Sequence, residues 1–171
     1  MKKFLFSIAL VLFAFSNVFA GVTTTDFNYK YNARKALGQG TVYAATSDVF
    51  NPSREAVKCS RKMSEEDIKE AVAQALAAAS TGVVHISPFI SNGEKKVRDA
   101  LLKAGYPIIV LVENGLTRYS KPAGEMFNTC ALGKLLVLSP WEYHTSKSLL
   151  NREKCTMLNE MAAQVAHLSA L

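Results

Sequence analysis

The clearest alternation of apolar and polar segments in the chain lies between residues 82 and 115. It starts with a short apolar run at 82–86, rich in β-branched residues, which is typical of a strand buried on both faces. Ser91 and Glu94 then have the spacing of a capping box, and apolar residues recur at helical intervals after them. A second apolar run follows at 107–112. This pattern predicts two parallel strands joined by a helix.

The same alternation continues on both sides of this unit. A short strand is predicted at 55–59, before a helix that Ser64 caps. Beyond residue 115, Pro122 is expected to open a helix, and a strand at 134–138 and a last helix from Asn151 follow. Strands that alternate with helices favour an α/β fold. We therefore expect a Rossmann-like three-layer sandwich with a mainly parallel sheet.

The inner faces of the last two helices can be assigned from their apolar positions. The helix after Pro122 is expected to turn Met126, Phe127, Cys130 and Ala131 inward, and the last helix Leu158, Met161, Ala162, Val165 and Leu168. An earlier segment, 41–45, is a further candidate strand.

The start of the chain has the features of a targeting segment. Lys2 and Lys3 precede an apolar run at 4–15, and Val18 and Ala20 are suitable for cleavage before Gly21. The run is shorter than the roughly 20 residues of a membrane span. We predict a signal peptide at 1–20, a lead-in at 21–50 and one Rossmann-like domain at 51–171. The protein would be periplasmic or secreted; an uncleaved anchor remains an alternative, as does a misassigned start, which would leave the protein in the cytoplasm.

Charge and cysteine content narrow the function only slightly. The chain has 20 Lys and Arg against 14 Asp and Glu, a net charge of +6. Such a mildly basic protein can bind nucleic acid or nucleotides but need not do so. The three cysteines have no metal-like spacing and their odd number does not suggest a disulfide framework. We therefore expect Cys130 and Cys155 to be small buried residues, and predict no metal and no cofactor.

Sequence motifs of catalysis are absent from the chain. There is no GxGxxG, Walker A or GxSxG sequence. The three histidines, His85, His144 and His167, are far apart, and His85 is expected to be a hydrogen-bonded core residue.

Polar residues gather where the predicted strands end, and parallel strands place those ends at one edge of the sheet, where ligands bind in such folds. The N-terminus of a helix beginning near Ser91 is suited to binding a phosphate. Arg61 could pair with such a phosphate. Trp141 is expected to pack against the sheet rather than stack on a base. The candidate ligand-binding residues are Ser60, Arg61, Lys62, Ser87, Ser91, Asn92, Gly93, Asn114 and Gly115.

Several segments between about residue 56 and 168 form a set: a first strand ending in Ser-Arg (57–61), the turn region 83–93, the pair Ala100-Leu101, the strand 108–115, the segment 119–122, the strand 133–140 and the pair Asn151-Arg152. In these segments the chain resembles the Rossmann-like domain of the DNA-processing protein A (DprA) family, within the superfamily of the lysine decarboxylase-like (LOG) phosphoribohydrolases. The last pair adds Arg152 to the candidate residues.

This resemblance implies binding of a nucleotide or single-stranded nucleic acid at the strand-end edge, and the absence of a catalytic motif favours binding without turnover. A homodimer is a further possibility. Two alternatives stay open. One is a nucleotide or nucleoside hydrolase with Glu94 or Glu113 as its acid/base, although the PGGxGTxxE motif of the LOG enzymes is absent. The other is an exported relative that has lost the ancestral ligand.

Overall fold

The computed structural model describes residues 36–37, 40–41, 53–116, 120–139, 141, 143–144 and 151–167. The predicted signal peptide at 1–20 lies outside these residues, as does almost all of the lead-in at 21–50. Two short strands, β1 (Ala36–Leu37) and β2 (Gly40–Thr41), pair antiparallel within the lead-in. The remainder of the candidate strand at 41–45, beyond Thr41, falls outside the described part.

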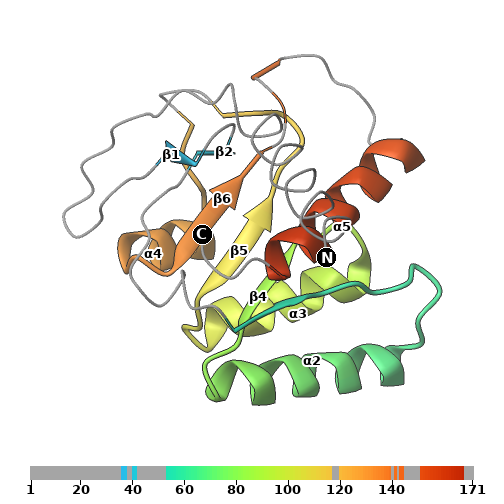
Figure 1. Cartoon of the computed structure of the whole chain (residues 1–171). Coiled ribbons are helices and arrows are strands. Elements are labelled where there is room, and N and C mark those ends of the chain that lie inside the picture. Colours follow the sequence, from blue (N-terminus) through green and yellow to red (C-terminus); the bar gives the residue numbers. More distant parts are fainter. Residues whose placement is uncertain are drawn as a thin grey trace, which may run out of the picture.

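A four-stranded sheet forms the centre of the described domain (Figure 1). Its strands are β3 (Arg54–Ala56), β4 (Val84–Ser87), β5 (Ile108–Leu111) and β6 (Leu135–Leu138), in that spatial order. All three pairings between neighbouring strands are parallel. With its interleaved helices, the sheet has the α/β Rossmann-like architecture that the hydrophobic pattern predicts.

Alternate residues of each strand face opposite layers, because side chains along a strand alternate between the two sides of a sheet. On β5, Ile108 and Val110 belong to one core cluster, and Ile109 and Leu111 belong to the other. All four residues are buried. This explains why the strand is a continuous apolar run rather than an alternating one.

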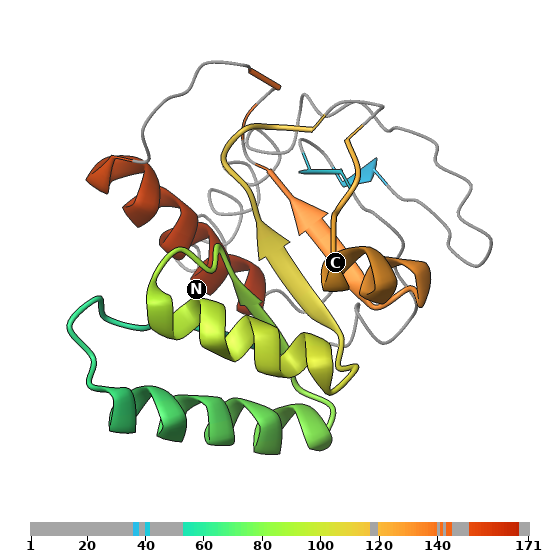
Figure 2. The same ribbon diagram turned by 180° about the vertical axis from the view of Figure 1, so that it is seen from behind.

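The helices divide unevenly between the two faces (Figures 1 and 2). Helices α2 (Glu65–Ser80), α3 (Asn92–Lys103) and α4 (Glu125–Ala131) pack on one face, and α5 (Arg152–Ala166) covers the other over β3 and β4. Right-handed crossovers between strands that follow one another in a single direction place every connecting helix on the same side. Since α5 follows the last strand, it is the helix that returns across the opposite face.

Two capping boxes fix where the first helices begin. Ser64 accepts a hydrogen bond from the Asp67 N–H, and the Asp67 carboxylate accepts one from the Ser64 N–H. Ser91 and Glu94 make the same reciprocal pair at the start of α3, as their spacing predicts. The last helix was predicted to start at Asn151; it begins at Arg152, and the Asn151 side chain caps it by accepting a hydrogen bond from the Lys154 N–H.

Several predicted details of the core are confirmed. The buried residues of α5 are Leu158, Met161, Ala162 and Val165, while Leu168 lies outside the described residues. His85 is 1% exposed, and its Nε2 lies 2.8 Å from the Ala75 carbonyl oxygen. The indole of Trp141 packs against the core cluster under α5.

Two predicted elements begin or end at different residues. The first strand ends at Ala56 rather than residue 59, because the backbone N–H of Cys59 turns away from the sheet to a carboxylate of α3. Helix α4 begins at Glu125 instead of Pro122, after Gly124 with φ +57°.

The predicted inward position of Phe127 is wrong. Phe127 is 39% exposed, because a helical turn of 100° per residue carries it away from the inward positions Met126 and Cys130.

Within the part of the chain that the structure describes, no helix combines the length and apolar character needed to span a bilayer.

Candidate functional site

A hollow of about 440 Å³ opens at the carboxyl end of β3, between the start of α3 and the first turns of α5. Its lining residues are Lys58, Cys59, Ser60, Arg61, Ile90, Ser91, Glu94, Cys155 and Asn159. A second hollow of about 670 Å³ adjoins it, shares Ser60, Arg61, Cys155 and Asn159, and adds Lys62, Arg152 and Thr156. Together they are called the basic hollow below. It lies at the edge of the sheet where the sequence predicts a ligand site.

One face of α5 forms a wall of the basic hollow. Arg152, Cys155, Thr156 and Asn159 recur at i, i+3, i+4 and i+7, which places them in one stripe of the helix. The apolar stripe of α5 faces the sheet instead. The helix is therefore amphipathic, and its polar stripe points at the ends of the strands.

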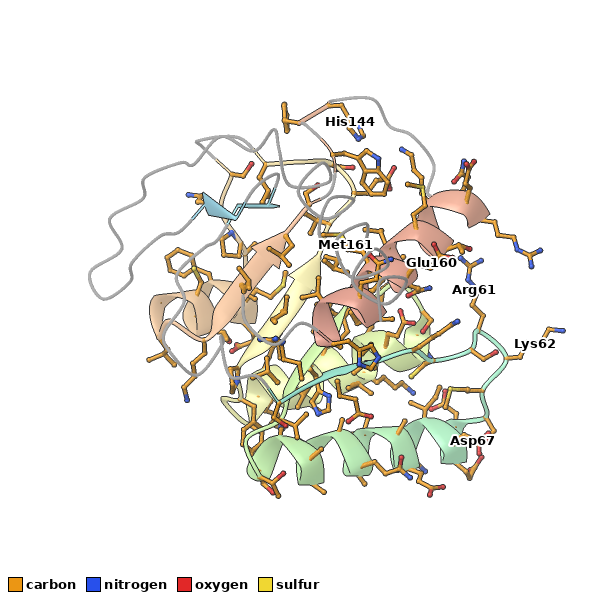
Figure 3. The ribbon with its side chains drawn as sticks, in the orientation of Figure 1. Arg61, Lys62, Asp67, His144, Glu160 and Met161 are labelled. Atoms are coloured by element: carbon orange, nitrogen blue, oxygen red, sulfur yellow. The ribbon has the colours of Figure 1, made fainter. Side chains whose placement is uncertain are left out.

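The opposite wall is the loop between β3 and α2. The Ser60 hydroxyl accepts a hydrogen bond from the Lys62 N–H at 3.2 Å, and the Ser60 carbonyl accepts one from the Met63 N–H at 3.2 Å. This turn presents Arg61 and Lys62 in succession. Figure 3 shows the Arg61 side chain directed toward α5 and Lys62 directed outward. Arg61 donates a hydrogen bond from Nη2 to the Cys155 sulfur at 4.0 Å, so the two walls touch.

Glu94 forms the floor of the basic hollow at the start of α3. Its side chain is 3% exposed, and its carboxylate accepts hydrogen bonds from three backbone N–H groups: Cys59 at 3.2 Å, Ile90 at 2.7 Å and Ser91 at 3.0 Å. The N-terminus of a helix attracts anions. At α3 this position is already occupied by a carboxylate of the protein itself.

Gly93 has a packing role in this region. A Cβ atom at Gly93 would stand 2.8 Å from the Cys59 Cβ and 3.2 Å from its sulfur. Only a residue without a side chain lets α3 approach the end of β3 this closely. Burial, together with the negative charge of Glu94, raises the pKa of the Cys59 thiol.

The structure brings together half of the predicted ligand-binding residues. Ser60, Arg61, Lys62, Ser91 and Arg152 line the basic hollow. The other five, which are Ser87, Asn92, Gly93, Asn114 and Gly115, are not among its lining residues. The hydroxyl of buried Ser87 accepts a hydrogen bond from the Phe89 N–H, and Asn92 is exposed.

Asn114 and Gly115 belong to a separate part of the sheet edge, beyond β5. The Gly115 N–H donates to the Ser139 hydroxyl at 3.1 Å, and the Asn114 carbonyl accepts from the His144 N–H at 3.1 Å. Figure 3 shows His144 far from Arg61. Loops that bond to each other therefore occupy this end of the sheet.

Glu113, the second acid/base candidate, also lies at the β5 end of the edge. It is buried and forms an ion pair with Lys154 of α5 at 2.8 Å. The Lys154 ammonium also lies 5.7 Å from the centre of the Trp141 ring. This pair fastens the start of α5 to the sheet.

The charge of the basic hollow is strongly asymmetric. Of the lining side chains in the described part of the chain, four are cationic, namely Lys58, Arg61, Lys62 and Arg152, and one is a carboxylate, Glu94. That carboxylate is buried and bonded to backbone N–H groups, whereas Arg61, Lys62 and Arg152 are exposed. The arrangement favours an anionic ligand.

Several residues of the basic hollow were not among the predicted ligand-binding positions. Lys58, Cys59, Cys155, Thr156 and Asn159 were missed, and Cys155 is only partly buried, contrary to the expectation of a small core residue. The polar stripe of α5 was the available signal. Its i, i+3, i+4, i+7 spacing is visible in the sequence once the apolar stripe is assigned.

Comparison of the chain with protein-family models, curated proteins and solved structures gave no significant match. Among the described residues, no three or more His, Cys, Asp or Glu side chains are grouped so that they could hold a metal ion.

Proposed function

We propose that this protein binds a nucleotide or a short single-stranded nucleic acid in the basic hollow without chemical turnover. The observation that carries the proposal is the convergence of Arg61 and Lys62 from the β3–α2 loop with Arg152 from α5 on one concave surface. Guanidinium groups suit phosphates because their planar N–H forks can bond two oxygens at once.

The polar groups around these cations fit a phosphate and sugar backbone better than a base. Ser60, Thr156 and Asn159 offer hydroxyl and amide groups within the same surface. Among the described residues that line the hollow there is no Phe, Tyr or Trp, and Trp141 packs against the core instead. Since base recognition in single strands depends largely on aromatic stacking, contacts to phosphates would dominate the affinity.

The hydrogen bonds of Glu94 favour binding over hydrolysis. A general acid/base has to exchange a proton with the substrate, but three backbone N–H groups already bond to the Glu94 carboxylate. Glu113 is likewise held by Lys154. Both candidate acids therefore have structural partners.

Fluorescence anisotropy of the full chain with a labelled single-stranded oligonucleotide tests this function. We expect binding at low salt that weakens steeply as salt is added, because each neutralised phosphate releases counterions. Inorganic phosphate at high concentration should compete. Nucleoside monophosphates incubated with the protein should release no free base. Absence of binding at low salt would refute the binding proposal. Release of free base that Glu94→Gln abolishes would instead support the alternative function of a nucleotide or nucleoside hydrolase.

A further inference from the structure

Cys155 is the accessible thiol of the basic hollow. Cys59 lines the same surface but is 7% exposed, and Cys130 is fully buried. Cys155 is partly exposed and lines both parts of the hollow. Thiol chemistry requires an accessible sulfur that can form a thiolate. Burial and the negative charge of Glu94 raise the pKa of the Cys59 thiol, which disfavours a thiolate at Cys59.

Cations surround the approach to the Cys155 sulfur. The Arg61 guanidinium donates to Sγ from the loop opposite α5, and Arg152 lies one turn earlier on the same helix. Lys62 extends the positive surface outward. A reagent that carries negative charge would be concentrated beside this sulfur, and a cationic one would be repelled.

We propose that Cys155 is a modification site for low-molecular-weight disulfides that carry carboxylates. This proposal uses only the charge and shape of the basic hollow, so it does not depend on nucleotide binding. The acidic groups of the ligand would pair with Arg61 and Arg152 while its sulfur reaches Cys155.

The reaction is thiol–disulfide exchange. The Cys155 thiolate attacks one sulfur of the incoming disulfide and the S–S bond of the ligand breaks. A new S–S bond joins Cys155 to one half of the ligand, and the other half leaves as a thiolate, which takes up the proton that Cys155 lost. Cys155 is thereby oxidised, and the departing half is reduced.

The test compares three disulfides that differ in charge: anionic oxidised glutathione, uncharged bis(2-hydroxyethyl) disulfide and cationic cystamine. The full chain is incubated with each at low ionic strength, intact-mass spectrometry gives the rate, and peptide mapping locates the adduct. Each rate is divided by the rate for the urea-unfolded chain, which removes intrinsic reactivity. We expect Cys155 to react first, and the normalised rate for oxidised glutathione to exceed that of the uncharged reagent about tenfold, with cystamine slowest.

The variant Arg61→Gln should reduce this preference for the anionic reagent several-fold, and added salt should do the same. Lys103→Gln, at the far end of α3, is the matched control and should keep it. Equal normalised rates for the three reagents would overturn the proposal. So would a first adduct on Cys59 or Cys130, or a preference that Arg61→Gln leaves intact.

Discussion

The backbone N–H of Cys59 donates a hydrogen bond to the Glu94 carboxylate at 3.2 Å, and this contact joins the end of β3 to the start of α3. The two residues are 35 positions apart in the chain. The bond brings the 58–62 loop alongside α3, so the basic hollow depends on it. Glu94 is thus part of the scaffold of the site.

Replacing Glu94 with alanine should destabilise the protein by about 3 kcal/mol, because three backbone N–H groups at a buried position lose their acceptor. Urea unfolding followed by circular dichroism measures the change. Glu160→Ala, at an exposed position on α5, is the control and should stay within about 0.5 kcal/mol of the parent chain. Equal stability of the two variants would show that Glu94 is not structural.

Gly93→Ala should destabilise the protein by about 1–3 kcal/mol, the usual range for an overpacked core. The added Cβ would stand 2.8 Å from the Cys59 Cβ, so α3 and the end of β3 must separate. The same urea titration measures this. Asn92→Ala, one residue earlier and exposed, should have little effect. A stabilised Gly93→Ala variant would mean that the gain in helix propensity outweighs the clash.

Alkaline pH should weaken the fold through Cys59. Burial and Glu94 raise the pKa of its thiol in the folded state, whereas the unfolded thiol ionises near pH 8.5. The unfolded state then holds fewer protons than the folded state above that pH, so the free energy of unfolding falls as pH rises from about 8.5 through the folded pKa. Below about pH 8.5 the Cys59 thiol is protonated in both states, so the free energy of unfolding is not reduced by its ionisation there.

Urea titrations between neutral and alkaline pH, made on the parent chain and on Cys59→Ala, isolate this effect. The decline with pH should be shallower in Cys59→Ala, since other groups titrate equally in both chains. Identical slopes would contradict a raised Cys59 pKa.

The order of the strands and helices could be predicted because their apolar patterns are strong. The run at β5, for example, is continuously apolar, and the strand is buried on both faces inside the sheet. The capping residues Ser64 and Ser91 gave correct helix starts because capping is a local interaction.

The contents of the site were harder to predict because they depend on tertiary contacts. Gly93 next to a helix start suggests a phosphate turn, but its packing partner, Cys59, lies on another segment. Cys155 was expected in the core because it was assigned to a helix face among apolar residues, yet α5 turns it toward Arg61. The apolar stripe of a helix can be identified from the sequence of that helix alone. The residues that face its polar stripe belong to other segments, so they cannot be identified in the same way.

Arg61→Ala provides the most direct test of the basic hollow as a ligand site. Anisotropy titrations with a labelled single-stranded oligonucleotide, repeated at several salt concentrations, should show affinity reduced by about 1–3 kcal/mol and a salt dependence lowered by about one released ion. The melting temperature should hardly change, because Arg61 is exposed. Lys103→Ala should match the parent chain in all three measurements. If Arg61→Ala binds as tightly as the parent chain and melts at a lower temperature, Arg61 stabilises the fold and the basic hollow is not the binding site.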